Sequence, residues 1–193
     1  MKAQDEQSDA ELIRAYQEGR PHAFDQLLQR YQSSLFTYLL RWVWDRSVAE
    51  DLFQETFVRV IRALPEYREQ NKFGSWLFGI AHRLCIDHSR KQQSLGHYFS
   101  DAAAGTEMAF LFDLADPGPS PLDTLEEKEL SAIITRGVEE MPMELKEVFL
   151  LRQHGELPFR EIAALLERPL NTVLGRMRQA VQYLRQLVEK QYV

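Results

Sequence analysis

The chain has 193 residues, of which 45% are hydrophobic and 27% are charged, and its formal net charge is −6. This length and composition are typical of a soluble globular protein with one or two domains. They exclude a helical membrane protein, because no apolar run approaches the roughly 18 residues that cross a bilayer. Cys85 is the only cysteine, which excludes a disulfide framework and a cysteine-rich metal site. The polar, acidic N-terminus does not resemble a signal peptide, so we expect a cytoplasmic location.

Apolar residues recur with helical spacing through residues 9–91, and no window alternates with the period of two that a strand requires. We therefore predict one all-helical domain over this half. Asp9, Ser47 and Ser75 each precede a helical pattern, and their side chains can accept hydrogen bonds from first-turn amides, so we expect them to be N-caps. The predicted helices cover residues 9–18, 21–44, 48–64 and 76–91, and a polar loop covers residues 65–74.

The predicted helix over residues 48–64 has two different faces. An apolar stripe is formed by Phe53, Phe57, Val60, Ile61 and Leu64. The other side carries Asp51, Gln54, Glu55, Val58 and Arg62. Acidic residues near the start of a helix interact favourably with its dipole, so an ordinary solvated face is one interpretation. A docking face for a basic partner is the other.

The predicted helix over residues 76–91 has a core side that includes Trp76 and a mostly basic outer side. The outer side carries His82, Arg83, Asp87, His88, Arg90 and Lys91. Next to a polar loop that contains aromatic residues, such a face suits single-stranded nucleic acid, because cations hold phosphates while bases stack. An ordinary amphipathic helix with a basic C-terminal end is the alternative. The spacing of six between the two histidines does not place them on one helix face, so we expect no metal.

Residues 92–124 are polar, acidic and rich in proline and glycine, which predicts a flexible linker. Residues 101–129 contain eight acidic residues and one basic residue, Lys128, so this segment has a net charge of −7 and the rest of the chain has a net charge of +1. The apolar run at residues 108–112 predicts either a short helix that docks on a domain or a segment that contacts a larger partner.

Helical spacing returns over residues 125–190, where we predict a second helical domain that ends in a helix-turn-helix. Pro169 interrupts the pattern, and Asn171 is a suitable N-cap for the helix that follows. The second helix of such a motif presents its first side chains to the DNA major groove. Those side chains are Thr172, Leu174, Gly175, Arg176 and Arg178. Residues 168–190 carry a net charge of +4, which favours contact with a phosphate backbone.

Two blocks of this sequence resemble a known family. Residues 49–91 resemble region 2 of the sigma-70 superfamily, and residues 141–187 resemble its region 4. The order of the two blocks, with no region 3 between them, is similar to that in the extracytoplasmic-function group of sigma factors. The resemblance implies an all-α fold with a region 2 bundle at residues 9–91, an acidic linker at 92–124 and a region 4 helix-turn-helix at 125–190. It also implies a role in transcription initiation, with no enzymatic activity and no cofactor.

The resemblance implies three binding surfaces. Region 2 is expected to bind the core of bacterial RNA polymerase through Asp51, Gln54, Glu55 and Arg62. It is expected to capture flipped bases of the melted −10 promoter element through Tyr67, Asn71, Lys72, Trp76, Arg83, Asp87, Arg90 and Lys91. Region 4 is expected to read the −35 element as duplex through Arg160, Asn171, Thr172, Leu174, Gly175, Arg176 and Arg178. Regulation by an anti-sigma factor is a further expectation, and we expect the free protein to be a monomer.

The chain departs from the family pattern at several of these positions. Arg83 stands where the family commonly has Asn, which puts the base preference at −10 in doubt. Leu174 and Gly175 stand where a Lys-Ser pair is usual, and a glycine costs about 1 kcal/mol of helix propensity relative to alanine. We therefore predict an altered −35 sequence or a weak −35 contribution.

Two other functions remain open from the residues alone. A stand-alone transcriptional regulator would use the helix-turn-helix on duplex DNA without polymerase, but it would not need the block at residues 49–91. A helical interaction module is favoured only by the weakened DNA-reading helix. An enzyme has the least support, because the sequence shows no nucleophile elbow, phosphate loop or paired carboxylates.

Overall fold

The computed structural model describes residues 7–68, 72–94 and 125–191, and these residues form helices and turns without a strand. The all-α prediction is therefore confirmed. The helices are α1 (Asp9–Gln17), α2 (His22–Val43), α3 (Arg46–Ala63), the 3-10 turn η1 (Leu64–Glu66), α4 (Phe73–Ser94), α6 (Leu125–Glu139), α7 (Met143–Gln153), α8 (Phe159–Leu165) and α9 (Leu170–Gln191). Within the described residues no helix is both long and apolar enough to span a bilayer.

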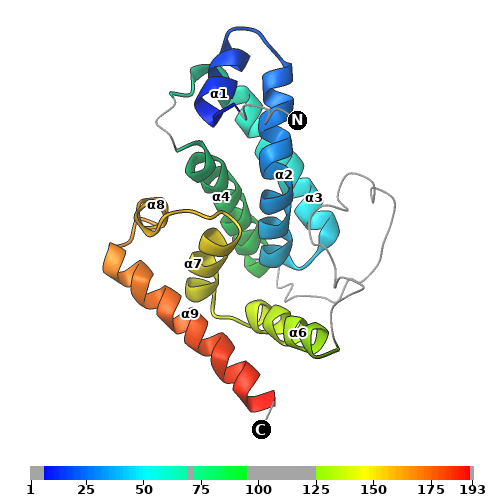
Figure 1. Cartoon of the computed structure of the whole chain (residues 1–193), viewed down its shortest axis with the longest axis vertical. Coiled ribbons are helices and arrows are strands. Elements are labelled where there is room, and N and C mark those ends of the chain that lie inside the picture. The colour runs from blue at the N-terminus through cyan, green and yellow to red at the C-terminus, as the bar shows by residue number, and fades with distance from the viewer. Residues whose placement is uncertain (1–6, 69–71, 95–124, 192–193) are drawn as a thin grey trace, which may run out of the picture.

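In the N-terminal half, α1, α3 and α4 pack around the long helix α2, as Figure 1 shows. The core between them is aromatic, and Tyr38, Phe36 and Phe78 are fully buried. T-shaped ring pairs such as Tyr38–Phe78, with centroids 5.4 Å apart, fix the rotation of each helix against its neighbour. This half therefore gives α4 a rigid support on its core side.

The observed N-caps differ from the predicted ones by one or two residues. Ser8 caps α1 and forms a capping box with Glu11, which frees Asp9 to accept hydrogen bonds from Arg30 and Tyr31 of α2. At α3 the cap is Asp45, whose carboxylate accepts from the amide of Val48 at 3.0 Å. Our assignments of Asp9 and Ser47 were therefore wrong, because the chain offers two suitable residues at each start.

The start of α4 also differs from the prediction. The helix begins at Phe73, so Ser75 lies in its first turn and is not the N-cap. At the other end α4 extends to Ser94, three residues into the stretch that we expected to be linker. The rest of that predicted linker, including the apolar run at residues 108–112, lies outside the described residues.

In the C-terminal half, α6 and α7 support the helix-turn-helix formed by α8 and α9. The long helix α9 begins at Leu170, and the amides of Thr172 and Val173 donate to the carbonyl of Pro169. Asn171 is therefore inside the helix and is not its N-cap. Val173 and Ala180 are fully buried against the other helices, and this contact fixes the orientation of α9.

The two halves pack on each other. Helix α7 contacts α2, and α8 contacts α4, while α9 lies on the outer side of the molecule (Figure 1). Phe78 of α4 approaches Gly155, where a Cβ would lie 3.3 Å from the Phe78 ring and 2.7 Å from the carbonyl oxygen of Leu151. The absence of a side chain at Gly155 allows this close approach.

Candidate nucleic-acid and polymerase interfaces

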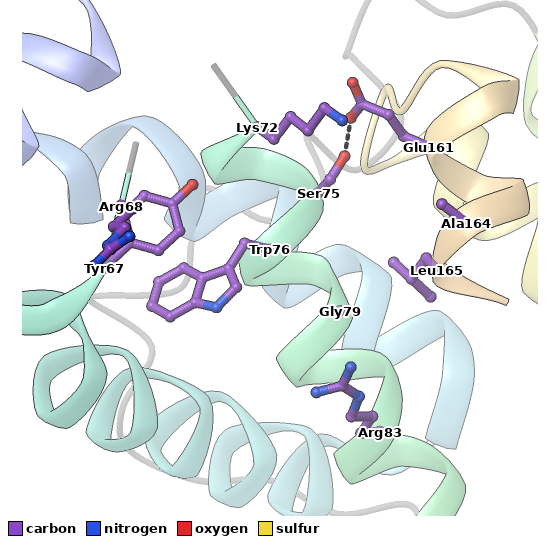
Figure 2. A pocket seen from close by; sticks show the side chains of 10 residues that line it. All are labelled: Tyr67, Arg68, Lys72, Ser75, Trp76, Gly79, Arg83, Glu161, Ala164 and Leu165. Carbon is purple, nitrogen blue, oxygen red and sulfur yellow. Dashed lines mark hydrogen bonds between the residues drawn. The ribbon is translucent and has the colours of Figure 1, made fainter. Parts of the chain in front are cut away.

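A pocket of about 380 Å³ lies between α4 and α8, so both halves of the chain form its wall (Figure 2). Four of the residues expected to bind −10 DNA, namely Tyr67, Lys72, Trp76 and Arg83, lie together here. A fifth, Asn71, lies outside the described residues. The complete lining is Tyr67, Arg68, Lys72, Ser75, Trp76, Gly79, Arg83, Glu161, Ala164 and Leu165.

Aromatic rings form one side of the pocket. The rings of Tyr67 and Trp76 lie 4.4 Å apart at 37°, and Phe73 packs on both at 5.9 and 5.7 Å. The backbone before this cluster is held by Gln17 of α1, whose amide donates to the carbonyls of Leu64 and Tyr67 at 2.9 and 2.8 Å. The fixed backbone holds Tyr67 next to Trp76 of α4, and the two rings form a preformed surface on which a base can stack.

Cationic side chains surround the aromatic rings. Arg68 and Lys72 come from the segments on either side of the undescribed residues 69–71, and Arg83 lies two turns further along α4 than Trp76. All three are exposed to solvent. Three positive charges near aromatic rings are an arrangement that can hold phosphates while bases stack.

The opposite wall belongs to α8. Glu161 places its carboxylate against α4, where the hydroxyl of Ser75 donates a hydrogen bond to it. Figure 2 shows the Lys72 side chain pointing toward the same carboxylate. Leu165 lies over Gly79, where a Cβ would be 3.6 Å from its Cδ1. The helix-turn-helix thus contributes both an acidic and an apolar residue to the cationic face of α4.

Three other residues expected at the −10 site do not line the pocket. Asp87, Arg90 and Lys91 are exposed on the C-terminal part of α4, beyond Arg83. They extend the charged surface along α4 beyond the pocket. The structure thus separates the expected −10 residues into a pocket group and this distal group.

His82 is not part of the outer face, where we had placed it. Its side chain is only 10% exposed and its Nδ1 lies 3.0 Å from the hydroxyl of Tyr38. Its Nε2 lies 4.0 Å from a carboxylate oxygen of Glu147 on α7. Burial, together with the nearby charge of Arg83, lowers the pKa of His82 to about 4. The ring is therefore neutral near pH 7 and belongs to the contact between the halves.

The exposed side of α3 combines charged and apolar residues. Asp51, Gln54 and Arg62 are exposed, and Glu55 accepts a hydrogen bond of 2.8 Å from Arg59. Ile61, which we assigned to the buried stripe, is 42% exposed and joins Val58 on this side. We call the surface formed by Asp51, Gln54, Glu55, Val58, Ile61 and Arg62 the α3 face. Exposed apolar residues bordered by charges are typical of a protein-binding surface.

The start of α9 presents several of the residues expected to read duplex DNA. Asn171, Thr172 and Arg178 are exposed, as is Arg160 on α8. Leu174 and Gly175 are half-buried, and a Cβ on Gly175 would meet nothing within 4 Å. No close packing in the described structure therefore requires a glycine at this position.

Arg176 is the exception among these residues. Its side chain is 12% exposed and donates hydrogen bonds of 2.8 Å to both Glu147 and Glu144 of α7. The two carboxylates hold the guanidinium against α7, and the group is not directed outward into solvent. In this structure Arg176 joins α9 to α7, while Arg178 remains available at the surface.

Sequence reasoning missed four residues that shape these sites. Gln17 fixes the pocket backbone, Ser75 and Glu161 link α4 to α8, and Glu147 lies between His82 and Arg176. Glutamine, serine and glutamate are common on helices, so their types gave no signal. Each of them acts on a residue at least 29 positions away, which helical spacing does not report.

Comparison with known proteins gives the family. Residues 27–95 match the Sigma-70 region 2 model, and residues 131–184 match the Sigma-70, region 4 model. The chain is 28% identical over 176 residues to RNA polymerase sigma-H factor of Pseudomonas aeruginosa, which covers 89% of each chain. It is 29% identical over 174 residues to the ECF RNA polymerase sigma factor SigW of Bacillus subtilis, which covers 90% of this chain and 92% of that one.

A solved structure shows the same fold. The sigma factor RpoE of Bartonella quintana, in complex with the anti-sigma factor NepR, superimposes with a TM-score of 0.67 at 18% identity. The match covers 86% of this chain and 96% of that one. With both conserved regions matched in order and relatives covered almost from end to end, the chain belongs to the extracytoplasmic-function group of the sigma-70 family, whose members are transcription initiation factors.

Proposed function

We propose that this chain directs core RNA polymerase to a specific set of promoters and helps to melt their −10 element. Besides family membership, one structural observation supports this proposal. The packed rings of Tyr67 and Trp76 line the same pocket as the cations Arg68, Lys72 and Arg83. Such a site binds nucleic acid by stacking and charge, so its role is recognition and not catalysis.

In this proposal the pocket holds bases that have left the duplex. Unstacking and unpairing a base costs a few kcal/mol, and stacking on an aromatic side chain returns about 1–3 kcal/mol per base. Trp76 and Tyr67 provide the stacking surface, and Arg68, Lys72 and Arg83 bind the flanking phosphates. The distal group Asp87, Arg90 and Lys91 then contacts the strand beyond the pocket. Arg83 adds a long cationic side chain where a base edge would be read, so it influences base preference at −10.

In this proposal the start of α9 binds duplex DNA. Asn171, Thr172 and Arg178 are the exposed groups that can reach base edges or phosphates, with Arg160 of α8 contacting the backbone. Arg176 is bound to Glu144 and Glu147, so it contributes no outward charge in this arrangement. We therefore propose a −35 contribution that is weaker than the residue types alone suggest.

In this proposal the α3 face binds core polymerase. Its charged rim sets the orientation of the partner, and Val58 and Ile61 supply apolar area to bury. We further propose that the chain acts in the cytoplasm as a monomer, without a metal or cofactor, and that an anti-sigma factor controls it. The solved complex of the Bartonella quintana sigma factor with its anti-sigma factor supports this last part.

Binding to purified core polymerase tests the proposal. Asp51→Arg and Glu55→Arg reverse charges on the α3 face, and Asp25→Arg makes the same change at an exposed position near the start of α2. We expect the unmodified chain and Asp25→Arg to form a stable complex, and the two α3 variants to lose it. No complex with the unmodified chain, together with binding to duplex DNA alone, would favour a stand-alone regulator instead.

A further inference from the structure

We infer that α1 is a positioning element for −10 recognition, because it holds both chain segments that carry the aromatic rings of the pocket. Gln17 is its main positioning residue. The inference rests on the proposed function of the pocket and adds residues that set base preference without contacting a base. None of the described residues of α1 lines the pocket, so their effect on a bound strand is indirect.

The first segment that α1 holds leads to Tyr67. The side-chain amide of Gln17 donates hydrogen bonds to the carbonyls of Leu64 and Tyr67, at 2.9 and 2.8 Å. Leu64 begins the turn η1 and Tyr67 follows its last residue, so a single planar amide is bonded to both ends of this turn. Gln17 therefore fixes the backbone from which the Tyr67 ring extends.

The second segment is the start of α4. Asp9, in the first turn of α1, accepts hydrogen bonds from the side chains of Arg30 and Tyr31 on α2. The Tyr31 ring packs on Phe73 with centroids 5.4 Å apart, and a Cβ on Gly74 would lie 3.5 Å from the same ring. Through Tyr31, Asp9 thus sets the position of the first two residues of α4.

The two segments meet in one cluster of rings. Phe73 packs on Tyr67 and on Trp76, at 5.9 and 5.7 Å, and the latter two rings lie 4.4 Å apart. A displacement of either segment therefore changes the surface on which a base stacks. Groups that contact a ligand recognise it selectively only when neighbouring hydrogen bonds and packing hold them in place. Here α1 provides hydrogen bonds of this kind on both sides of the cluster.

Helix α1 is itself firmly anchored. Its start is closed by the capping box of Ser8 and Glu11, and its apolar side chains Leu12 and Ile13 are fully buried. Gln17 is the last residue of this helix, and it donates from there to the turn before the pocket. An anchored support can fix the position of another segment, which an exposed glutamine on a mobile loop could not do.

The test uses holoenzyme assembled from core polymerase and the full chain, with Gln17→Met as the main variant. Methionine has a similar length and helix propensity and leaves the net charge unchanged, but it cannot donate a hydrogen bond. Gln26→Met is the matched control at an exposed position of α2. The probe is a pool of single-stranded DNA with a randomised central segment, and the bound strands are sequenced.

We expect the unmodified chain and Gln26→Met to enrich the same short motif relative to core polymerase alone. Gln17→Met should lower this enrichment about tenfold, which corresponds to about 1.4 kcal/mol and lies within the contribution of one stacked base. All three chains should bind core polymerase equally, because the α3 face is unchanged. A purely structural role of Gln17 predicts lower stability in urea with equal enrichment by the folded complexes, and that result would overturn the inference.

The second segment is tested with Tyr31→Phe, which removes the hydroxyl that Asp9 binds and keeps the ring on Phe73. We expect a smaller loss of enrichment, about threefold, since the hydrogen bond to a charged group is lost while the packing stays. Tyr16→Phe, which removes a hydroxyl elsewhere on α1, is the control and should have no effect. An effect of Gln17→Met alone would overturn the claim that α1 holds both segments. Failure of the proposed function would appear separately, as no motif enriched by the unmodified chain.

Discussion

Arg176, on the helix expected to read DNA, donates a hydrogen bond of 2.8 Å to the carboxylate of Glu147 on α7. Both side chains are mostly buried, at 12% and 15% exposed. Burial raises the pKa of Glu147, while the charge of Arg176 opposes that rise. The same carboxylate lies 4.0 Å from His82 across the contact between the halves. A residue of the DNA-reading helix is thus connected to the helix that carries the −10 pocket.

The first prediction concerns the stability of region 4. Arg176→Gln leaves the carboxylate of Glu147 without its main partner in a mostly buried site. We expect the free energy of unfolding to fall by about 3 kcal/mol. Arg178→Gln, at an exposed position two residues later, should change it by less than about 0.5 kcal/mol. Urea unfolding followed by circular dichroism measures both, and equal effects would show that Arg176 is not a packing residue.

The same two variants should affect DNA binding in the opposite order, with the larger effect for Arg178→Gln. Arg178→Gln removes an exposed cation, so we expect weaker binding to duplex DNA and a salt dependence reduced by about one released counterion. Arg176→Gln should leave the salt dependence of the remaining folded protein unchanged. Fluorescence anisotropy with a labelled duplex at several salt concentrations gives the slopes. A reduced slope for Arg176→Gln would mean that Arg176 leaves Glu147 to contact a phosphate.

Gly175 gives a prediction with a gain of stability. It lies inside α9 with open space where its Cβ would be, so Gly175→Ala introduces no clash. We expect a gain of about 1 kcal/mol in the free energy of unfolding, because alanine loses less backbone entropy in a helix. Gly137→Ala is the contrasting change, since a Cβ there would lie 2.8 Å from the side chains of Leu184 and Leu187. Thermal melts should therefore move in opposite directions, and a destabilised Gly175→Ala would contradict the placement of α9.

Because His82 is buried with a lowered pKa, we expect the protein to lose stability in mild acid. Its pKa is about 4 in the folded chain, against about 6.5 for an exposed histidine in the unfolded chain. Between these values the unfolded chain binds the proton and the folded chain does not. Stability therefore falls as the pH drops from about 6.5 toward 4, by about 3 kcal/mol in all.

His82→Gln keeps a polar side chain next to Tyr38 but removes this titration, so its unfolding free energy should depend less on pH over the same interval. The unmodified chain, measured under the same conditions, is the control. Urea unfolding at pH 7 and pH 4.5 makes the comparison. An unchanged pH dependence in His82→Gln would show that the acid response comes from other groups.

The sequence was sufficient to predict the all-α fold and the helix-turn-helix, because apolar residues with helical spacing identify a buried face. Boundaries were less certain where two capping residues compete. Asp45 and Ser47 are both good caps, and only the observed hydrogen bond to the amide of Val48 selects Asp45. Spacing also left the edge of a stripe ambiguous, so Ile61 was placed in the core although it is 42% exposed.

The candidate site was predictable only in part. Tyr67, Lys72, Trp76 and Arg83 come from one short stretch, and they do line one pocket. Helical spacing does not report what a face packs against, so the residues that α8 adds to this pocket could not be predicted. Ser75 and Glu161 are separated by 86 positions. His82 and Arg176 were misplaced for the same reason, since each faces a partner from another helix.

Reconstituted transcription tests the central claim most directly. Purified core polymerase is mixed with the chain and a library of DNA fragments from the same genome, and the 5′ ends of the transcripts are sequenced. The account predicts discrete start sites that share an upstream motif, and the loss of these transcripts with Trp76→Ala, which removes the stacking surface. Transcripts with the same random starts as core polymerase alone would contradict the claim that this chain selects promoters.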